Sequence, residues 1–217
     1  GDSACCLPSI TLSTKSIKTI KQWTKSLAIE LDVIGLINLQ FAVKRDSEDN
    51  EIVFIIEANP RASRTVPFVS KATGIPLAKI ATQLVLGKTL KQIGLNKEPI
   101  PPLQAVKEAV MPFRRFPGSD SLLGPEMRST GEVMGSANTF GMAYAKAELA
   151  AGEELPTSGF VFLSTHDRDK PALTPVAKKL IQLGFSLLAT SGTAKYLEKF
   201  DLNVEMVLKV HEGRPNI

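Results

Sequence analysis

Two short apolar segments joined by a wholly polar stretch constrain the fold of this chain more than any other feature. Residues 36–43 (LINLQFAV) alternate apolar and polar side chains, and residues 53–59 (VFIIEAN) are rich in strand-forming types. Between them, residues 44–51 (KRDSEDNE) contain no apolar side chain, which is typical of a turn between paired strands. The pattern predicts an antiparallel hairpin.

The predicted hairpin gathers three oxygen-bearing side chains on one face. Because side chains alternate along a strand, Glu57 and Asn59 project together. Pairing Gln40 opposite Glu57 leaves a loop of residues 46–51. One carboxylate and two amides suit a hard cation such as Mg²⁺, which keeps other positions for phosphate oxygens. The spacing predicts a Mg²⁺–nucleotide site at these three residues.

Two arginines follow this strand directly. Arg61 and Arg64 are three positions apart, and guanidinium groups match phosphate oxygens and neutralise charge during phosphoryl transfer. A purely structural alternative is a salt bridge from Glu57 to an arginine, combined with an Asn-Pro turn. Short motifs have many false positives, so the residues alone leave both interpretations open.

Periodicity along the rest of the chain predicts a mixed α/β architecture in two domains. Small and polar residues at 150–158 (AAGEELPTS) mark a boundary, so we expect domains over residues 1–150 and 151–217. In the first domain, helices are predicted at 13–31, 67–73, 76–86 and 139–149, with extended segments at 105–111 and 126–134 around a loop at 114–125.

The second domain reads as strand, helix, strand, helix, strand, which is how a parallel α/β sheet begins. The predicted ranges are 159–163, a buried strand, then 174–183, 186–189, 193–200 and 204–210. Residues 190–193 (TSGT) end a strand and start a helix, so their amides and hydroxyls would form an anion site. A simple N-cap turn explains the same residues equally well.

Composition excludes several classes of protein. The 217 residues are 43% apolar and 22% charged, as in ordinary globular chains, and the net charge of +4 includes no basic block that would indicate nucleic-acid or membrane binding. No apolar stretch approaches the roughly 20 residues of a bilayer span. Adjacent Cys5 and Cys6 predict free, packing thiols in a reducing cytoplasm. A start at Gly1 without Met suggests a segment of a longer chain.

Several longer motifs resemble one enzyme family. GLINLQFAVKRDSEDNEIVFIIEANPRASRTVPFVSK, GDSACCLP, VKEAVMPF and LLGPEMRSTGEVMG resemble the second half of the carbamoyl-phosphate synthase large subunit, an ATP-grasp ligase. The resemblance runs from Gly1 to Ile217. It implies a partial ATP-grasp domain with an antiparallel hairpin, followed by a partial parallel α/β domain of the methylglyoxal-synthase type.

The resemblance implies a role for each matched side chain. Gln40, Glu57 and Asn59 would hold Mg²⁺ or Mn²⁺ ions that bridge the ATP phosphates, and Arg61 and Arg64 would face phosphates and carbamate. The implied reaction is ATP-dependent phosphorylation of carbamate to carbamoyl phosphate, for pyrimidine and arginine synthesis. The implied partners are a glutaminase small subunit, the remainder of the large subunit and bicarbonate. Without the upstream nucleotide-binding subdomain and lid, the segment alone is expected to be inactive.

Two effector sites are implied as well. Asp2 and Glu108 match acidic positions that bind ornithine in bacterial members, and two carboxylates suit an ammonium group; the alternative is that Asp2 is a loop residue preceding a helix and Glu108 a solvated strand residue. The residues that match positions binding nucleotide monophosphates such as UMP or IMP are Lys170, Thr190, Thr193 and Lys209.

Two functions other than carbamate phosphorylation are compatible with parts of the sequence. A stand-alone nucleotide-sensing regulatory module would need only residues 190–193, and the intact set around Gln40 and Glu57 disfavours it. Another ATP-grasp carboxylate ligase is disfavoured by the RSTGEVMG motif and by the appended α/β domain.

Overall fold

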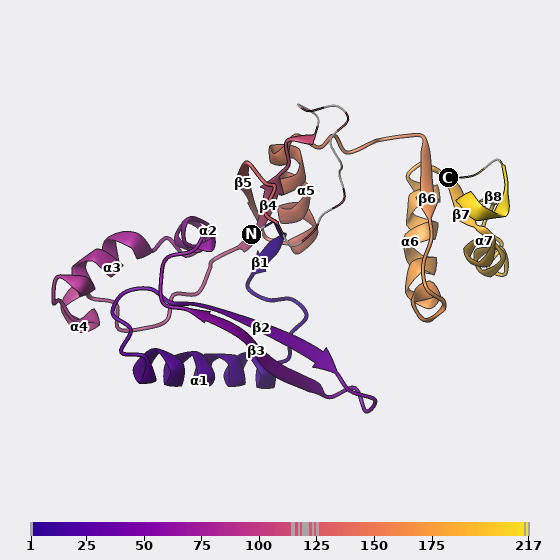
Figure 1. Ribbon diagram of the computed structural model, residues 1–217. Coiled ribbons are helices and arrows are strands. Elements are labelled where there is room, and N and C mark those ends of the chain that lie inside the picture. The colour runs from indigo at the N-terminus through magenta and orange to yellow at the C-terminus, as the bar shows by residue number, and fades with distance from the viewer. Residues whose placement is uncertain are drawn as a thin grey trace. The chain divides into compact units, whose positions relative to one another are not determined.

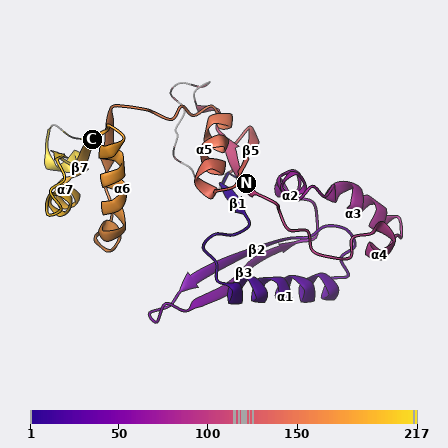
Figure 2. The same ribbon diagram turned by 180° about the vertical axis from the view of Figure 1, so that it is seen from behind.

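The computed structural model describes residues 2–113, 116, 118, 122, 124, 126–214 and 216. It divides into two compact units, residues 1–154 and 155–217, each with its own core. Figures 1 and 2 show the chain from opposite sides. Most of the loop expected at 114–125 lies outside the described residues.

The first unit mixes antiparallel strands with helices. Its elements are β1 (Cys5–Leu7), α1 (Thr14–Glu30), β2 (Asn38–Arg45), β3 (Glu51–Asn59), α2 (Thr65–Thr73), α3 (Leu77–Val85), α4 (Leu90–Ile93), β4 (Gln104–Val110), β5 (Gly131–Ala137) and α5 (Phe140–Ala151). Among these elements, β1 and α4 were not predicted from the sequence. β1 has only three residues, and four-residue α4 completes less than two turns, so neither leaves a clear periodicity.

The β2–β3 hairpin is antiparallel and has the predicted pairing of Gln40 with Glu57. A β-bulge interrupts the ladder, because Phe41, the residue after Gln40, pairs with Ile55 and leaves Ile56 as an extra residue in β3. The ladder closes with Arg45 opposite Glu51. The turn is therefore residues 46–50, one residue shorter than predicted.

The bulge also decides which face each side chain occupies. Residues paired directly across an antiparallel ladder share a face, so Glu57 lies on the face of Gln40, whereas Ile55 lies on the opposite face with Phe41. In a regular strand, Ile55 and Glu57 would share one face. Ile55 can therefore face α1 while Glu57 faces away from it.

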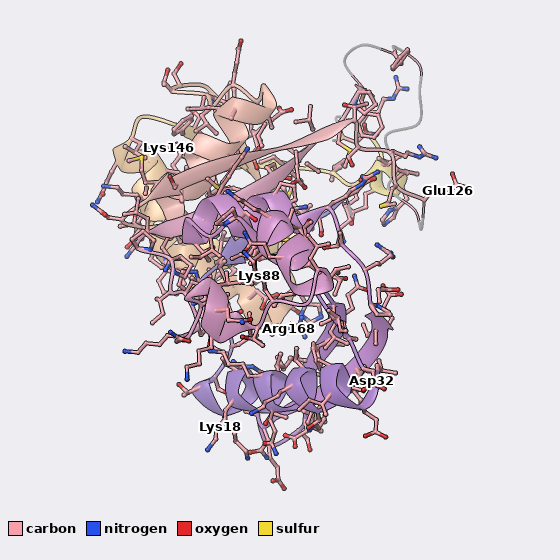
Figure 3. All side chains as sticks on the ribbon, turned by 90° about the vertical axis from the view of Figure 1, so that its left-hand side faces the viewer. Lys18, Asp32, Lys88, Glu126, Lys146 and Arg168 are labelled. Carbon is pink, nitrogen blue, oxygen red and sulfur yellow. The ribbon has the colours of Figure 1, made fainter. Side chains whose placement is uncertain are left out.

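Helix α1 lies along the hairpin in both ribbon views (Figures 1 and 2). Its apolar side contacts the hairpin, where Trp23, Leu27 and Ile55 line a shallow depression. Lys18, on the same helix, is exposed to solvent (Figure 3). The helix begins where Ser13 accepts a hydrogen bond from the Ser16 amide at 3.2 Å, which is a standard N-cap.

A second sheet has the strand order β1-β4-β5 and is antiparallel throughout. On one side of it, Cys5 packs against a cluster that contains Phe68 of α2. Cys6 packs against the cluster formed by Val106, Ala143 and Ala147, which includes helix α5. Both cysteines are free, so the prediction of packing thiols is confirmed.

The second unit contains a three-stranded parallel sheet, as predicted. Its elements are β6 (Phe160–Leu163), η2 (Asp167–Asp169), α6 (Lys170–Gln182), β7 (Ser186–Thr190), α7 (Ser191–Glu198), β8 (Val204–Val207) and η3 (Val210–Glu212), with sheet order β6-β7-β8. Its core comprises Leu163, Ala177, Leu187, Ala189, Ala194, Leu197 and Val204.

The prediction that β6 is a buried strand is wrong for two of its residues. Phe160 is 68% exposed and Phe162 is 40% exposed. Leu163 belongs to the core that α6 and α7 form with the sheet, and Phe160 and Phe162 alternate with Val161 and Leu163 along the strand. The two phenylalanines therefore occupy the sheet face that this core does not cover.

In the described part of the chain, no helix combines the length and the apolar character that crossing a membrane requires.

Candidate functional site

The face of the hairpin that carries Gln40 and Glu57 borders an open hollow of about 520 Å³ in the first unit. Four of the five residues predicted for metal and phosphate binding line it: Gln40, Glu57, Arg61 and Arg64. The hairpin supplies the first pair, and the turn between β3 and α2 supplies the arginines. Strand β4 and the segment preceding β1 complete the wall through Lys107 and Ser3.

The fifth predicted residue, Asn59, is tied to Glu57. Its side-chain amide donates a hydrogen bond to Glu57 Oε1 at 2.8 Å. The two side chains lie two positions apart, beyond the bulge, so normal alternation puts them on one face. Because the amide nitrogen is directed to the carboxylate, the amide oxygen of Asn59 and the second oxygen of Glu57 are left to bind a cation.

The two arginines have partners other than Glu57. Arg61 Nη1 donates to the backbone carbonyl of Ala62 at 3.0 Å, and Arg64 Nη1 donates to Ser129 Oγ at 3.0 Å. Arg64 Nη1 also lies 3.9 Å from Asp2 Oδ1. Within the described residues, no ion pair joins either arginine to Glu57. The salt-bridge alternative for this motif therefore finds no support in the structure.

Two residues that the sequence reasoning missed contribute to the same hollow. Asn38 pairs with Asn59 in the ladder and lies on the face of Gln40. Its place two residues before Gln40 in an alternating strand could have predicted that the two side chains share a face. Lys107 is only 2% exposed and its ammonium lies 3.9 Å from Glu132 Oε2. A lysine within the AVKEAV strand, which is apolar apart from Lys107 and Glu108, was the signal there, because buried lysines are rare without partners.

The proposed ornithine residues are held by separate groups. Asp2 Oδ2 accepts hydrogen bonds from the backbone amides of Arg128 and Ser129. Hydrogen bonds from the Ser129 hydroxyl and the Arg128 amide lower the pKa of Asp2. Glu108 Oε1 accepts from the Ala109 amide at 3.0 Å. Among the described residues, no hydrogen bond or shared ion pair links the two carboxylates.

Glu108 lies near helix α5. A hydrogen bond to Glu148, together with burial and the charges of Glu148 and Glu108, raises the pKa of Tyr144. Lys107, by contrast, lines the hollow on the other face of β4. Successive side chains of a strand point to opposite faces, so Glu108 is directed away from the hollow that Lys107 lines.

In the second unit, three of the four predicted effector residues form one polar cluster. Lys170 Nζ donates to the Gly192 carbonyl at 2.8 Å and pairs with Asp167 at 2.6 Å. This ion pair lowers the pKa of Asp167. The hydroxyls of Thr190 and Thr193 lie 3.4 Å apart.

The cluster extends to two residues that the sequence analysis did not select. Ser164 Oγ lies 3.3 Å from Thr190 Oγ1, and the Thr165 amide donates to Thr193 Oγ1 at 3.4 Å. Thr165 Oγ1 is buried without a hydrogen-bond partner. Their position directly after β6, at the carboxyl edge of a parallel sheet, was the available signal.

The fourth predicted effector residue, Lys209, follows β8 and is exposed. Its backbone amide donates to Glu212 Oε2 at 2.9 Å, and within the described residues no hydrogen bond links it to Lys170. Thr190 occupies the N-cap position of α7, yet its side chain makes no capping hydrogen bond. The simple N-cap interpretation is therefore incomplete for this turn.

Across the described residues, no three or more His, Cys, Asp or Glu side chains gather in one place. Any metal held here would rely on amide oxygens beside a carboxylate. Such a donor set matches hard cations rather than the transition metals that prefer imidazole and thiolate.

Comparison with known proteins identifies the class. Residues 1–93 match the family model "Carbamoyl-phosphate synthase L chain, ATP binding domain", and residues 172–217 match the model "MGS-like domain". The fold is a partial ATP-grasp unit followed by part of an MGS-like domain. Over its whole length the chain is similar to the large chains of carbamoyl phosphate synthase.

Individual relatives show the extent of the match. The large chain of Nostoc sp. is 59% identical over 217 residues, and that of Synechocystis sp. is 58% identical over 218 residues; each match covers 100% of this chain and 20% of the relative. A solved biotin carboxylase domain of a single-chain bacterial carboxylase is 26% identical with a TM-score of 0.42, covering 51% of this chain and 26% of that one. The chain thus spans about one fifth of the length of its curated relatives.

Proposed function

We propose that this chain forms one wall of the site at which a longer protein uses ATP to phosphorylate carbamate to carbamoyl phosphate. The observation that carries the proposal is the hairpin register. It puts Gln40 opposite Glu57 on a face that borders the same hollow as Arg61 and Arg64. Phosphoryl transfer depends mainly on positioning and charge neutralisation, and these side chains are suited to both.

A divalent cation, Mg²⁺ or Mn²⁺, fits this donor set. Glu57 supplies one carboxylate, and Gln40 and Asn59 supply amide oxygens on the same face. The hydrogen bond from Asn59 to Glu57 fixes both side chains before any ligand arrives. When bound, the ion would neutralise the ATP phosphates.

The chain's own residues would then orient anions. In the proposed step a carbamate oxygen forms a bond to the γ-phosphorus of ATP, the bond from that phosphorus to the β,γ-bridging oxygen breaks, and ADP leaves. Arg61 and Arg64 would stabilise the negative charge on the transferred group and on carbamate. The hollow they share with Glu57 is open, which is consistent with further walls contributed by the rest of a longer chain.

The name of the relatives, "large chain", supports a small-subunit partner, which we propose to be a glutaminase that delivers ammonia. Bicarbonate and the remainder of the large chain would complete the pathway to carbamate. We place the whole enzyme in the cytoplasm, where it would supply pyrimidine and arginine synthesis.

The second unit is proposed as an effector site for nucleotide monophosphates such as UMP or IMP. Lys170, Thr190 and Thr193 meet at the carboxyl edge of the sheet, where α/β proteins commonly bind ligands, and Lys209 would approach from the end of β8. Ornithine binding by Asp2 and Glu108 stays a separate proposal, for which the structure offers no shared contact.

The decisive experiment compares Glu57→Ala with Glu48→Ala in the full-length parent chain. Carbamoyl phosphate formation is measured from ammonia, bicarbonate and Mg²⁺-ATP. Glu57→Ala should lower synthesis roughly 100-fold, as expected for loss of one preorganised electrostatic group, while part of the bicarbonate-dependent ATPase remains. Glu48, exposed at the hairpin tip, serves as the control. Unchanged synthesis in Glu57→Ala would reject the metal assignment.

A further inference from the structure

Arg64 stands between two hollows of the first unit. One is the hollow described above, and the other, of about 310 Å³, is lined by Arg64 together with Pro67, Ser129, Gly131 and neighbouring residues. The Arg64 side chain is 52% exposed, so packing alone does not fix its position. Its polar contacts must therefore decide which of the two hollows the guanidinium faces.

Those contacts come from a fixed acid and a hydroxyl. Arg64 Nη1 donates to Ser129 Oγ at 3.0 Å, and the backbone amide of the same Ser129 donates to Asp2 Oδ2 at 3.1 Å. Asp2 itself is held in place by the backbone amides of Arg128 and Ser129. Asp2 and Arg64 are thus both hydrogen-bonded to Ser129, and the main chain at residues 128–129 holds Asp2 in place.

The remaining oxygen of Asp2 is directed at the same arginine. Asp2 Oδ1 is buried, takes no hydrogen bond within the described structure and lies 3.9 Å from Arg64 Nη1. The Asp2 side chain is only 11% exposed, so the surrounding protein holds this carboxylate in place. A carboxylate with one oxygen bound to amides and the other facing a guanidinium is arranged to orient that guanidinium.

We propose that Asp2 and Ser129 are positioning residues that hold Arg64 ready to bind the carbamoyl group or phosphate of the substrate. They engage Nη1, which leaves the other guanidinium nitrogens for an anion in the hollow beside Glu57. This inference rests on the proposed function of Arg64. It gives Asp2 a role inside the synthetic site, in addition to any role in effector binding.

The test uses the reverse reaction, in which the full-length parent chain makes ATP from Mg²⁺-ADP and carbamoyl phosphate. Ser129→Ala should raise KM for carbamoyl phosphate roughly 3- to 10-fold, the range expected for loss of one ordinary hydrogen bond, with KM for Mg²⁺-ADP unchanged. Ser129→Thr keeps the hydroxyl and should restore most of the affinity. General damage to the fold would alter both KM values and would not be rescued by threonine.

A double-mutant cycle shows whether Asp2 acts through Arg64. Asp2→Asn should raise KM for carbamoyl phosphate in the wild-type background and have little further effect in an Arg64→Lys background, because the partner geometry is already lost. Equal effects in both backgrounds would overturn the proposal, as would an unchanged KM in Ser129→Ala. If Arg64→Lys itself leaves the reaction unchanged, the function proposed for Arg64 fails instead.

Discussion

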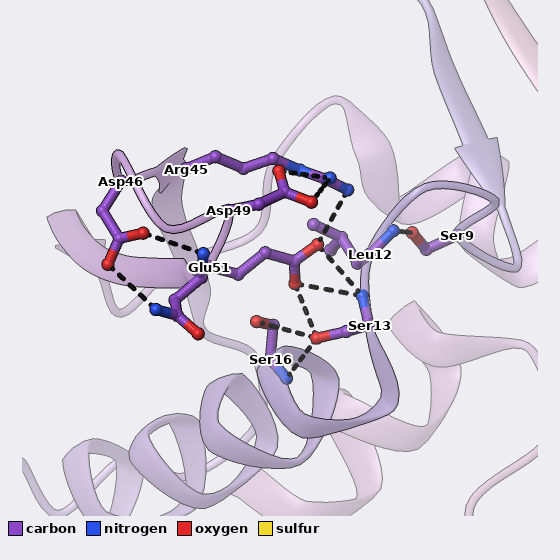
Figure 4. A network of polar contacts seen from close by, with 9 residues as sticks. Ser9, Leu12, Ser13, Ser16, Arg45, Asp46, Asp49 and Glu51 are labelled. Carbon is purple, nitrogen blue, oxygen red and sulfur yellow. Dashed lines mark hydrogen bonds and ion pairs between the residues drawn. The ribbon is translucent and has the colours of Figure 1, made fainter.

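Glu51 Oε2 accepts a hydrogen bond from the Ser13 hydroxyl at 2.6 Å and another from the Ser13 backbone amide at 3.1 Å (Figure 4). These bonds join the first residue of β3 to the N-cap of α1. Hydrogen bonds from Ser13 and Ser16, with the charge of Arg45, lower the pKa of Glu51 from 4.5 to about 2. The ionised form of Glu51 therefore stabilises the contact between hairpin and helix.

This link makes the stability of the first unit depend on pH. Since the folded pKa of Glu51 is lowered, its contribution is complete above about pH 4.5 and declines as the pH falls towards 2. Glu51→Gln should lower the melting temperature at neutral pH, and its difference from wild type should shrink on acidification. Glu30→Gln, at the exposed far end of α1, is the control. A difference that stays constant between about pH 6 and pH 3 would contradict this assignment.

Substitution of Gly135 should separate α5 from β5. A Cβ atom there would lie 2.6 Å from the Ala147 nitrogen and still closer to the Ala143 carbonyl oxygen, and both are backbone atoms that cannot rotate away. Gly135→Ala should lower the free energy of unfolding by about 2 kcal/mol or more, as overpacking does. Urea denaturation followed by the fluorescence of Trp23, the single tryptophan, measures it.

Gly131→Ala provides the matched control on the same strand, because a Cβ there meets nothing within 4 Å. Equal stability of the two variants would show that α5 does not pack as closely on β5 as the structure indicates.

Loss of the partner of buried Lys107 should also destabilise the first unit. Glu132→Gln removes the opposite charge 3.9 Å from the ammonium and should cost about 1–2 kcal/mol, less than for a fully buried pair because Glu132 is partly exposed. Exposed Glu126→Gln is the control. The same tryptophan signal in urea reports both changes, and identical midpoints would argue against a stabilising pair.

Removal of the Lys170 charge should weaken effector binding. Lys170→Gln removes the ammonium that reaches the start of α7, so the affinity of the full-length parent chain for UMP should fall roughly 10- to 100-fold. Lys178→Gln, exposed on α6, should bind as wild type does. Isothermal titration calorimetry measures both affinities, and equal binding by the two variants would remove Lys170 from the site.

Much of the first unit follows from local pattern. The alternation of apolar and polar side chains and the polar turn were sufficient to predict the hairpin. The pairing of Gln40 with Glu57 followed from the register that gathers the polar side chains on one face. The bulge at Ile56 did not follow, because an extra residue in a strand of apolar side chains leaves no compositional mark. That is why the predicted turn was one residue too long.

The residues that sequence reasoning missed depend on contacts between distant segments. Lys107 enters the hollow only because β4 pairs with β1, a three-residue strand without recognisable periodicity. Ser129 meets Arg64 across 65 positions. Motif recognition selected Asp2 for an effector site, whereas its bonds to the loop at 128–129 were accessible only from the fold.

The bulge at Ile56 has a wider consequence for how this strand can vary. It reverses the in–out parity of β3 partway along, so Ile55 before the bulge lies on the face that contacts helix α1, whereas Glu57 after it lies on the face that borders the hollow. Changes in length at the hairpin tip, beyond the Arg45–Glu51 pair, then leave the orientation of Glu57 and Asn59 untouched. The parts of β3 on either side of the bulge can therefore be changed by mutation independently.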